Sequence, residues 1–289
     1  MMKKIGFVGT GVMGAAIVSN LLEADYEVRV FNRTKSKTDA LVSQGAIWAD
    51  SPQLVAAQSD ITFSMVGFPT DVDTIYFEEN GIFAGAKKGS IVVDMTTSTP
   101  TLAKKIGDYA ENHELFALDA PVSGGDIGAK NAKLTIMVGG HEDIYEQVKP
   151  IFEKMGTTIA LFGGYGSGQH AKMANQIMIA GTMTGMTELL VYAKAANLDL
   201  ESVIKTVGGG SAANWSLANY APRILKDDYT PGFFAKHFLK DLRIALDEAE
   251  KMDIDLPLTK EAKRLYEKLV DEANLGNDGT QALIKLWWK

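Results

Sequence analysis

The sequence predicts an α/β protein in two parts, a doubly wound and mostly parallel sheet followed by an all-helical domain. Up to about residue 162, short apolar runs alternate with helical stretches, as they do in the β-α-β units of a parallel sheet. After a glycine-rich break at residues 163–168, no further strand pattern follows, and long stretches with helical spacing take over. We therefore expect one domain at residues 1–164 and an all-helical domain at residues 165–289.

The predicted strands are short apolar runs bounded by turn residues, and they cover residues 3–8, 27–31, 46–49, 61–66, 90–95, 115–119, 134–138 and 158–162. Helices are predicted between several of these strands, for example over residues 100–112 and 142–155. The helices predicted for the second domain cover residues 173–196, 237–252 and 258–273. Three prolines are interpreted as breaks between helices: Pro222, Pro231 and Pro257.

Length and composition narrow the possible functions. A chain of 289 residues with 46% hydrophobic residues has ample material for two cores. The net charge is −7 and no basic run stands out, so we expect no nucleic-acid partner. The absence of cysteine and the scattering of the four histidines predict no disulfide and no metal site. Because the first predicted strand leaves no room for a signal peptide, we expect a cytoplasmic protein.

The apolar stretch at residues 173–196 requires a check for a membrane span. It contains Gly181 and Gly185, a spacing that also occurs between packed membrane helices. Polar or charged residues interrupt the stretch, namely Asn175, Gln176, Glu188 and Lys194. We therefore expect a buried helix and no membrane span. Its apolar surface is more than a small helical domain covers, which predicts a homodimer or homotetramer.

A glycine-rich turn joins the first predicted strand to a stretch with a helical apolar stripe. The turn has the sequence Gly9-Thr10-Gly11-Val12-Met13-Gly14. Gly9 permits a tight turn, Gly11 lets phosphates approach the backbone N–H groups, and Gly14 lets the helix pack on the strand. A turn that serves packing alone is the alternative, but strand, turn and helix coincide here. The segment predicts a Rossmann-type dinucleotide site.

The end of the second predicted strand indicates which dinucleotide binds. NAD-specific sites usually place an acidic residue there, which accepts hydrogen bonds from the ribose. This chain has Asn32, Arg33 and Thr34 instead. A guanidinium pairs with a 2′-phosphate, whereas a carboxylate repels it. An ordinary surface arginine is the alternative for Arg33. The pattern favours NADP, with NAD possible.

Two further segments contain residues that could act on a substrate. Ser123, Gly124 and Gly125 follow a predicted strand, where a hydroxyl and backbone N–H groups could hold a carboxylate. An ordinary strand-to-loop turn is the alternative. In the long predicted helix, Lys172 is followed by Asn175 and Gln176 at spacings that share one helical face. From spacing alone, two interpretations of Lys172 are equally well supported. It is either a buried proton acceptor or a lysine whose side chain extends to solvent.

The segment at residues 233–242 is aromatic and basic. Its aromatic residues are typical of a core, and Lys240 with Asp241 fits a solvated helix face as well as it fits a site.

Taken together, these segments resemble those of the β-hydroxyacid dehydrogenase family, which includes 3-hydroxyisobutyrate dehydrogenases and semialdehyde reductases. The shared marks are, in the family's order, Gly9-x-Gly11-x-Met13-Gly14, Asp119-Ala-Pro-Val-Ser-Gly-Gly125, Gly166-x-Gly168-x-x-x-Lys172-x-x-Asn175 and Lys240-Asp241-Leu242. They span essentially the whole chain. The resemblance implies hydride transfer between a nicotinamide cofactor and a small 3-hydroxy acid or its semialdehyde, with Lys172 as general acid and base.

The resemblance also implies roles for individual positions. Ser123, Gly124 and Gly125 match the loop that anchors the substrate, and Asn175 matches a residue that orients it. Lys172 and Gln176 also match substrate-binding positions, but Gln176 stands where the family usually has a second asparagine, which moves the amide outward by about one methylene. The positions that match cofactor-lining residues are Val66, Gly67, Asp71, Thr96 and Lys240.

Two other functions fit the same architecture. An imine reductase is one, but the lysine at position 172 argues against it because those enzymes usually carry another residue there. A non-catalytic NADP-binding sensor is the other, and it would need neither Ser123, Lys172 nor Lys240.

Overall fold

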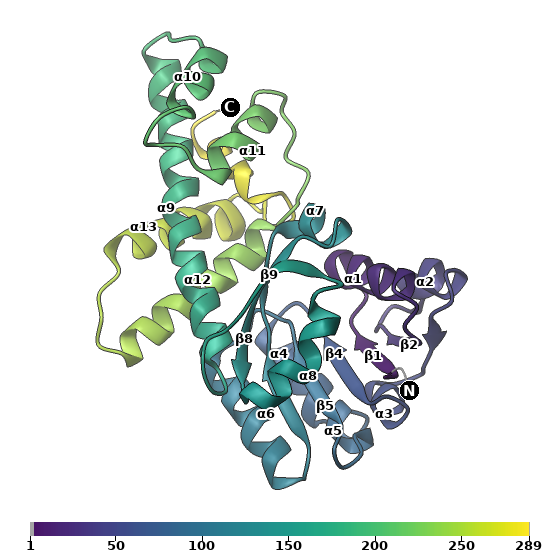
Figure 1. The fold of residues 1–289 in the computed structure, drawn as a ribbon. Helices are drawn as coiled ribbons and strands as arrows, with labels where there is room; N and C mark the ends of the chain where they lie inside the picture. The colour runs from purple at the N-terminus through teal and green to yellow at the C-terminus, as the bar shows by residue number, and fades with distance from the viewer. Residues whose placement is uncertain (1–2, 289) are drawn as a thin grey trace. The chain divides into compact units, whose positions relative to one another are not determined.

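The computed structural model describes residues 3–288 and divides the chain into two compact units, the first ending at Lys172 and the second starting at Met173. The α/β part and the following helical part that the sequence predicts are both present (Figure 1).

The described residues of the first unit form a nine-stranded sheet. Its strands are β1 (Ile5–Val8), β2 (Val28–Phe31), β3 (Ile47–Trp48), β4 (Ile61–Ser64), β5 (Ile91–Asp94), β6 (Phe116–Asp119), β7 (Val122–Ser123), β8 (Leu134–Gly140) and β9 (Gly156–Leu161). The order is β3-β2-β1-β4-β5-β6-β8-β7, with β9 beside β8. All pairs from β3 to β6 are parallel, as predicted, and β8 runs antiparallel to β6 and β7. The strand order reverses between β1 and β4, which is where ligands bind in such sheets.

Helices cover both faces of this sheet. They are α1 (Val12–Glu23), α2 (Asp39–Ser43), α3 (Pro52–Ala57), α4 (Pro69–Phe77), α5 (Ile82–Gly85), α6 (Pro100–Asn112), α7 (Gly125–Lys130) and α8 (Glu142–Phe152), with a 3₁₀ turn η1 (Lys35–Thr38). Neighbouring residues of one strand point to opposite faces. Accordingly Phe7 packs in one core with α1 and α8, whereas Val8 packs in a second core with α3, α4 and α6.

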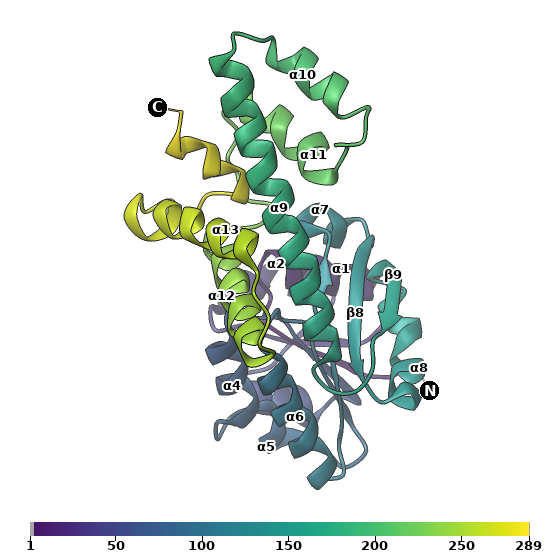
Figure 2. The same cartoon turned by 90° about the vertical axis from the view of Figure 1, so that its left-hand side faces the viewer.

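The second unit consists of helices within its described residues. Helix α9 (Ser167–Ala195) begins in the first unit and continues into the second. It is followed by α10 (Leu200–Val207), α11 (Trp215–Ile224), α12 (Ala235–Lys251), α13 (Pro257–Glu267), a π turn η2 (Lys268–Glu272) and a 3₁₀ turn η3 (Thr280–Leu286). Ala180 of α9, Phe238 of α12 and Tyr266 of α13 share one core, and Figure 2 shows these three helices side by side. None of the helices formed by residues 3–288 combines the length and apolarity needed to span a bilayer.

Two expectations about this unit are wrong. Pro222 does not end a helix but lies inside α11, which continues to Ile224. The proline removes the hydrogen bond that an N–H at this position would donate to the Ala218 carbonyl, but only two residues of the helix follow it. Helix α9 begins at Ser167, six residues before the predicted start at residue 173.

Two carboxylates are buried at the ends of neighbouring strands. Asp94 ends β5 and Asp119 ends β6, and the two residues pair in register. Asp94 accepts hydrogen bonds from the Ser64 hydroxyl at 2.9 Å and from the Thr96 backbone N–H at 3.1 Å. Burial nevertheless raises the pKa of Asp94 from 3.8 to about 6. The folded protein therefore binds a proton at Asp94 more readily than the unfolded chain does.

This raised pKa makes a stability prediction. The folded state gains stability from the Asp94 proton at low pH and loses it as the pH rises through about 6. Asp94→Asn keeps an acceptor oxygen for Ser64 and Thr96 but does not titrate. We expect the free energy of unfolding of the wild type, relative to Asp94→Asn, to fall by about 1 kcal/mol between pH 5 and pH 7.5. Urea denaturation of both proteins at the two pH values measures it, and an equal difference at both values would contradict it.

Candidate active site

The glycine-rich turn lies between the end of β1 and the start of α1. Gly9 has a φ of +100°, and a Cβ there would lie 2.2 Å from the Met65 carbonyl oxygen. A Cβ at Gly14 would lie 2.0 Å from the carbonyl oxygen of Gly9. Packing thus requires glycine at both positions. A Cβ at Gly11, in contrast, would meet nothing within 4 Å, although it would fill the space at the start of α1.

This open space fits an anionic group. The first N–H groups of a helix have no partner within the helix, and the positive end of its dipole attracts negative charge. The first turn of α1 contains no acidic residue, and its N-cap, Gly11, has no side chain to occupy those donors. The turn is therefore a suitable cradle for a pyrophosphate.

The residues after β2 lie against this turn. The Asn32 side chain accepts a hydrogen bond from the Thr10 N–H at 3.1 Å and donates one to the Thr34 carbonyl at 2.9 Å. It thereby joins the end of β2 to the glycine turn. The Thr10 hydroxyl is buried and has no hydrogen-bond partner among residues 3–288. Arg33 and Thr34 face solvent, and the Arg33 side chain is 91% exposed.

The loops after β4 and β5 supply the other predicted cofactor-lining residues of this unit. The backbone N–H of Val66 donates to the Thr96 hydroxyl at 3.0 Å, which joins the two loops. Gly67 follows in the same loop and is partly buried. Asp71 accepts the Phe68 N–H at 3.1 Å with one oxygen, and its other oxygen lies 3.8 Å from the Arg33 guanidinium. The structure therefore brings Arg33 and Asp71 together at the edge of the turn.

The Ser123 loop follows β6 and leads into α7. Gly124 has a φ of +129° and Gly125 a φ of +62°, conformations that side chains rarely adopt. Ser123 is half-buried and Gly124 is exposed. The loop thus depends on its two glycines for its shape, and it keeps a hydroxyl beside an exposed stretch of backbone.

Lys172 lies next to this loop. It is only 5% exposed, and its Nζ donates to the carbonyl oxygen of Val122 at 2.8 Å. Val122 immediately precedes Ser123, so the ammonium group is held beside the predicted substrate loop. Of the two alternatives that spacing left open, the structure thus has the buried lysine and not the solvated one.

Two residues that the sequence analysis did not single out position this lysine. Asp119 accepts the backbone N–H groups of Gly166 and Gln169, both at 2.8 Å, and thereby caps the first turn of α9. Burial raises the pKa of Asp119, and these N–H groups oppose the shift. The Gln169 side chain accepts the Ser98 N–H at 2.9 Å and donates to the Thr96 carbonyl at 2.8 Å. No periodic pattern marks Gln169 in the sequence, because residues 167–172 are mostly glycine and polar residues.

The remaining predicted residues lie in the second unit. The Asn175 side chain donates to the side-chain Oε1 of Gln176 at 2.7 Å, and the Gln176 side chain donates to the Asp241 carboxylate at 2.6 Å. Lys240 Nζ lies 3.1 Å from the other oxygen of Asp241. The side chain of Lys240 is 11% exposed and that of Asp241 is 1% exposed, so this pair is not a solvated helix face.

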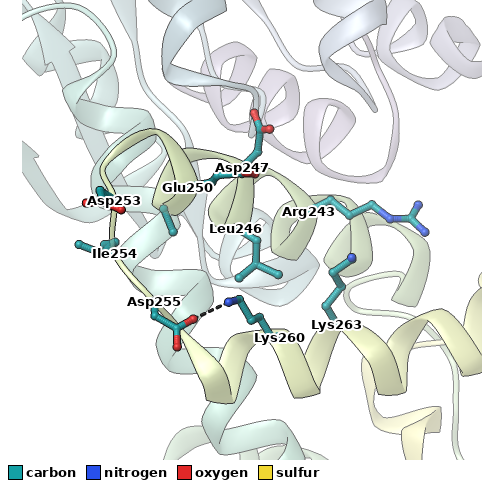
Figure 3. Close-up of a pocket in the computed structure, with 10 residues that line it drawn as sticks. Arg243, Leu246, Asp247, Glu250, Asp253, Ile254, Asp255, Lys260 and Lys263 are labelled. Carbon is teal, nitrogen blue, oxygen red and sulfur yellow. Dashed lines mark hydrogen bonds and ion pairs between the residues drawn. The ribbon is translucent and has the colours of Figure 1, made fainter.

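A surface hollow lies at the turn from α12 to α13 (Figure 3). Its lining is strongly charged and contains none of the predicted site residues. Several of these charges pair with one another or with near neighbours, as Lys260 does with Asp255 and Asp247 with Lys251. Among residues 3–288, no three acidic or histidine side chains lie together as metal ligands.

Comparisons with known proteins agree with this geometry. Residues 4–164 match the family described as the NAD binding domain of 6-phosphogluconate dehydrogenase. Residues 166–287 match the family described as NAD-binding of NADP-dependent 3-hydroxyisobutyrate dehydrogenase. The chain therefore binds a nicotinamide adenine dinucleotide.

Individual relatives cover the chain almost completely. It is 49% identical to the oxidoreductase YkwC of Bacillus subtilis over 289 residues, which is 100% of both chains. It is 37% identical to the 2-hydroxy-3-oxopropionate reductase of Escherichia coli, over 91% of this chain and 90% of that one. Among solved structures, a Mycobacterium tuberculosis 3-hydroxyisobutyrate dehydrogenase with L-serine is 29% identical, with a TM-score of 0.90 and 100% of both chains covered. The chain belongs to the β-hydroxyacid dehydrogenase family of NAD(P)-dependent oxidoreductases.

Proposed function

We propose that this enzyme interconverts a small 3-hydroxy acid and its semialdehyde or oxo acid, with NADP as the preferred cofactor and Lys172 as the proton-transfer residue. The observation that carries the proposal is the bond from the buried Lys172 ammonium to the Val122 carbonyl, beside the Ser123 loop. The names of two of the relatives point to the same class of substrate. The Escherichia coli protein is named for the reduction of 2-hydroxy-3-oxopropionate, and the Mycobacterium tuberculosis protein for the oxidation of 3-hydroxyisobutyrate.

The cofactor, when bound, supplies or accepts the hydride. In the first unit, the N–H groups at the glycine turn would hold its pyrophosphate, and Arg33 with Thr34 would hold a 2′-phosphate. Val66, Gly67, Asp71 and Thr96 would line it, as the family resemblance implies, and Lys240 is the cofactor residue proposed from the second unit.

The protein's own chemistry is the positioning of the substrate and the movement of one proton. The Ser123 hydroxyl and the N–H groups of Gly124 and Gly125 would bind the substrate carboxylate, which fixes the reacting carbon. Lys172 would accept the hydroxyl proton in oxidation and donate a proton to the new alkoxide in reduction. The Val122 carbonyl occupies one of the three N–H donors of the Lys172 ammonium, which orients the group. Asn175 would orient the substrate hydroxyl. We infer reduction as the cellular direction from the NADP preference.

A substrate screen tests the reaction class. Glyoxylate and the semialdehydes of succinate, tartronate and methylmalonate would each be offered with NADPH, and loss of absorbance at the reduced-nicotinamide band would be followed. We expect turnover with at least one of them. A cyclic imine is the comparison substrate. Turnover of the imine alone would identify an imine reductase, and binding of NADPH without any turnover would identify a sensor.

The lysine variants test the proton-transfer role. Removing a positioned acid–base group typically costs about 10²–10⁴ in rate, so Lys172→Ala should lose turnover by at least that order. Lys172→Arg should fail as well, because a guanidinium remains charged and does not accept a proton near neutral pH. Affinity for NADPH, measured by isothermal titration, should change little in both variants.

Lys104→Arg, on the exposed side of α6, is the matched control and should keep full activity. Turnover close to the wild-type rate in Lys172→Arg between pH 6 and pH 9 would reduce the role of Lys172 to electrostatics.

The preference for NADPH over NADH depends on Arg33 and on Asp71, which lies beside it. Charge-assisted pairs with phosphate favour NADPH. However, Arg33 is exposed and Asp71 lies 3.8 Å from it, so we expect a preference of about tenfold rather than more. Arg33→Ser should remove this preference and leave affinity for NADH unchanged. Asp71→Asn should increase it. Isothermal titration with both cofactors measures these effects, and equal affinities in the wild type would contradict the assignment.

The second unit presents a largely apolar stripe along α9, interrupted by the exposed Glu188, and this stripe supports the expected oligomer. Along α9, Met178 is 68% exposed and Tyr192 is 76% exposed. Gly181 and Gly185 lie between them at helical spacing, and a Cβ at Gly185 would meet nothing within 4 Å. We propose that a second copy of the chain covers this stripe and that the helical domain forms the contact. The cytoplasmic location stays a prediction.

Light scattering at micromolar concentration should therefore give at least twice the chain mass of 31.2 kDa. Gly185→Glu, which places a further charge on the stripe, should lower that mass. Gly164→Glu should not, because Gly164 is exposed in the first unit and a Cβ there would meet nothing within 4 Å. A wild-type mass near that of a single chain would contradict the contact.

A further inference from the structure

A buried carboxylate of the second unit connects two of its predicted site residues. Asp241 lies on α12, is 1% exposed and accepts the Gln176 amide N–H at 2.6 Å. Gln176 lies on α9, is fully buried and accepts a hydrogen bond from Asn175 at 2.7 Å. Asn175 is only partly buried. The three side chains form a chain of hydrogen bonds that leads from the interior toward the surface.

The chemistry of Asp241 fixes the direction of every bond in this chain. An ionised carboxylate accepts hydrogen bonds and donates none. Gln176 must therefore turn its NH₂ group toward Asp241, which turns its Oε1 toward Asn175. Asn175 in turn must present its NH₂ group to Gln176, so its Oδ1 faces away as an acceptor. Without the carboxylate, both amides could rotate by half a turn and bond equally well.

Packing alone does not explain this arrangement. The neighbouring residues on the same two helices are apolar, since Met173 and Ile177 of α9 contact Ile244 and Ala245 of α12. An apolar pair in place of Gln176 and Asp241 would join the helices as well, without the cost of burying a charge. The ion pair between Lys240 and Asp241, with 3.1 Å between Nζ and Oδ1, offsets that cost.

We propose that Asp241 is a positioning residue that sets, through Gln176, which atom of the Asn175 amide meets the substrate. Asn175 then offers its Oδ1 as an acceptor for a substrate hydroxyl, as its neighbour three positions earlier on α9, Lys172, handles the proton. Gln176 acts on Asn175 through its amide, whose NH₂ group donates to Asp241 and whose Oε1 accepts from Asn175. The inference rests on the proposed function for the part that Asn175 plays.

A double-mutant cycle tests this coupling. Asp241→Asn has nearly the same shape, but its amide can both donate and accept, so the direction of the chain is lost. We expect Asp241→Asn to lower kcat about tenfold in an otherwise wild-type enzyme and less than about twofold in an Asn175→Ala background, because coupled neighbours are not additive. A residue with only a structural role would lower kcat equally in both backgrounds.

Asp247→Asn is the matched control. Asp247 lies on the same helix, is exposed and pairs with Lys251, so this variant should leave kcat unchanged. If Asp241→Asn does not fold, Gln176→Leu interrupts the same chain of bonds and enters the cycle in its place. Equal losses of kcat in both backgrounds, or no loss in either, would overturn the proposal.

A second readout does not depend on turnover. In the cofactor-free protein, the side-chain amide resonances of Asn175, identified by their loss in Asn175→Ala, should shift in Asp241→Asn and stay in place in Asp247→Asn. If the shift occurs but no hydroxy acid or semialdehyde is turned over, the hydrogen-bond chain stands and the proposed function fails. If turnover occurs and the Asn175 resonances do not move, the role of Asp241 is wrong.

Discussion

The first unit depends on the buried carboxylate of Asp119, which ties the start of α9 to the end of β6. Its two oxygens accept the N–H groups of Gly166 and Gln169. This contact satisfies donors that the first turn of a helix otherwise leaves unpaired. The same part of α9 carries Gln169, whose side chain donates to the Thr96 carbonyl, and Lys172, whose Nζ donates to the Val122 carbonyl.

Such a close approach of helix and sheet demands glycine on both sides. A Cβ at Gly168 would lie 2.5 Å from the Met137 carbonyl oxygen, and one at Gly139 would lie 2.4 Å from an Asp119 oxygen. Gly166 has a φ of +86°, which lets the chain turn into the helix. Gly166 and Gly168, which precede Lys172, therefore let the start of α9 pack against the Asp119 carboxylate.

The same contact explains what the sequence predicted and what it did not. The core strands could be predicted because a buried strand is apolar in its own sequence, whichever elements pack against it. The start of α9 was missed because residues 167–172 carry glycine and polar residues, and a cap supplied from 47 residues earlier stabilises them. Strand β7 has two residues, Val122 and Ser123, and so shows no periodicity. Helix α11 was not predicted because Pro222 was interpreted as a break.

The sequence suggests candidate site residues, but it does not predict the hydrogen bonds between them. Glycine spacing, Arg33 and Lys172 can be found along the chain, because the chemistry of each residue type suggests its use. Hydrogen-bond direction, in contrast, belongs to sets of side chains that only the fold brings together. The sequence fits Lys240 and Asp241 to a solvated helix face as well as to a site, and their burial excludes the solvated face. Once Asp241 is known to be buried, its charge determines how Gln176 and then Asn175 must point, so a single buried carboxylate carries information that no pattern of spacing contains.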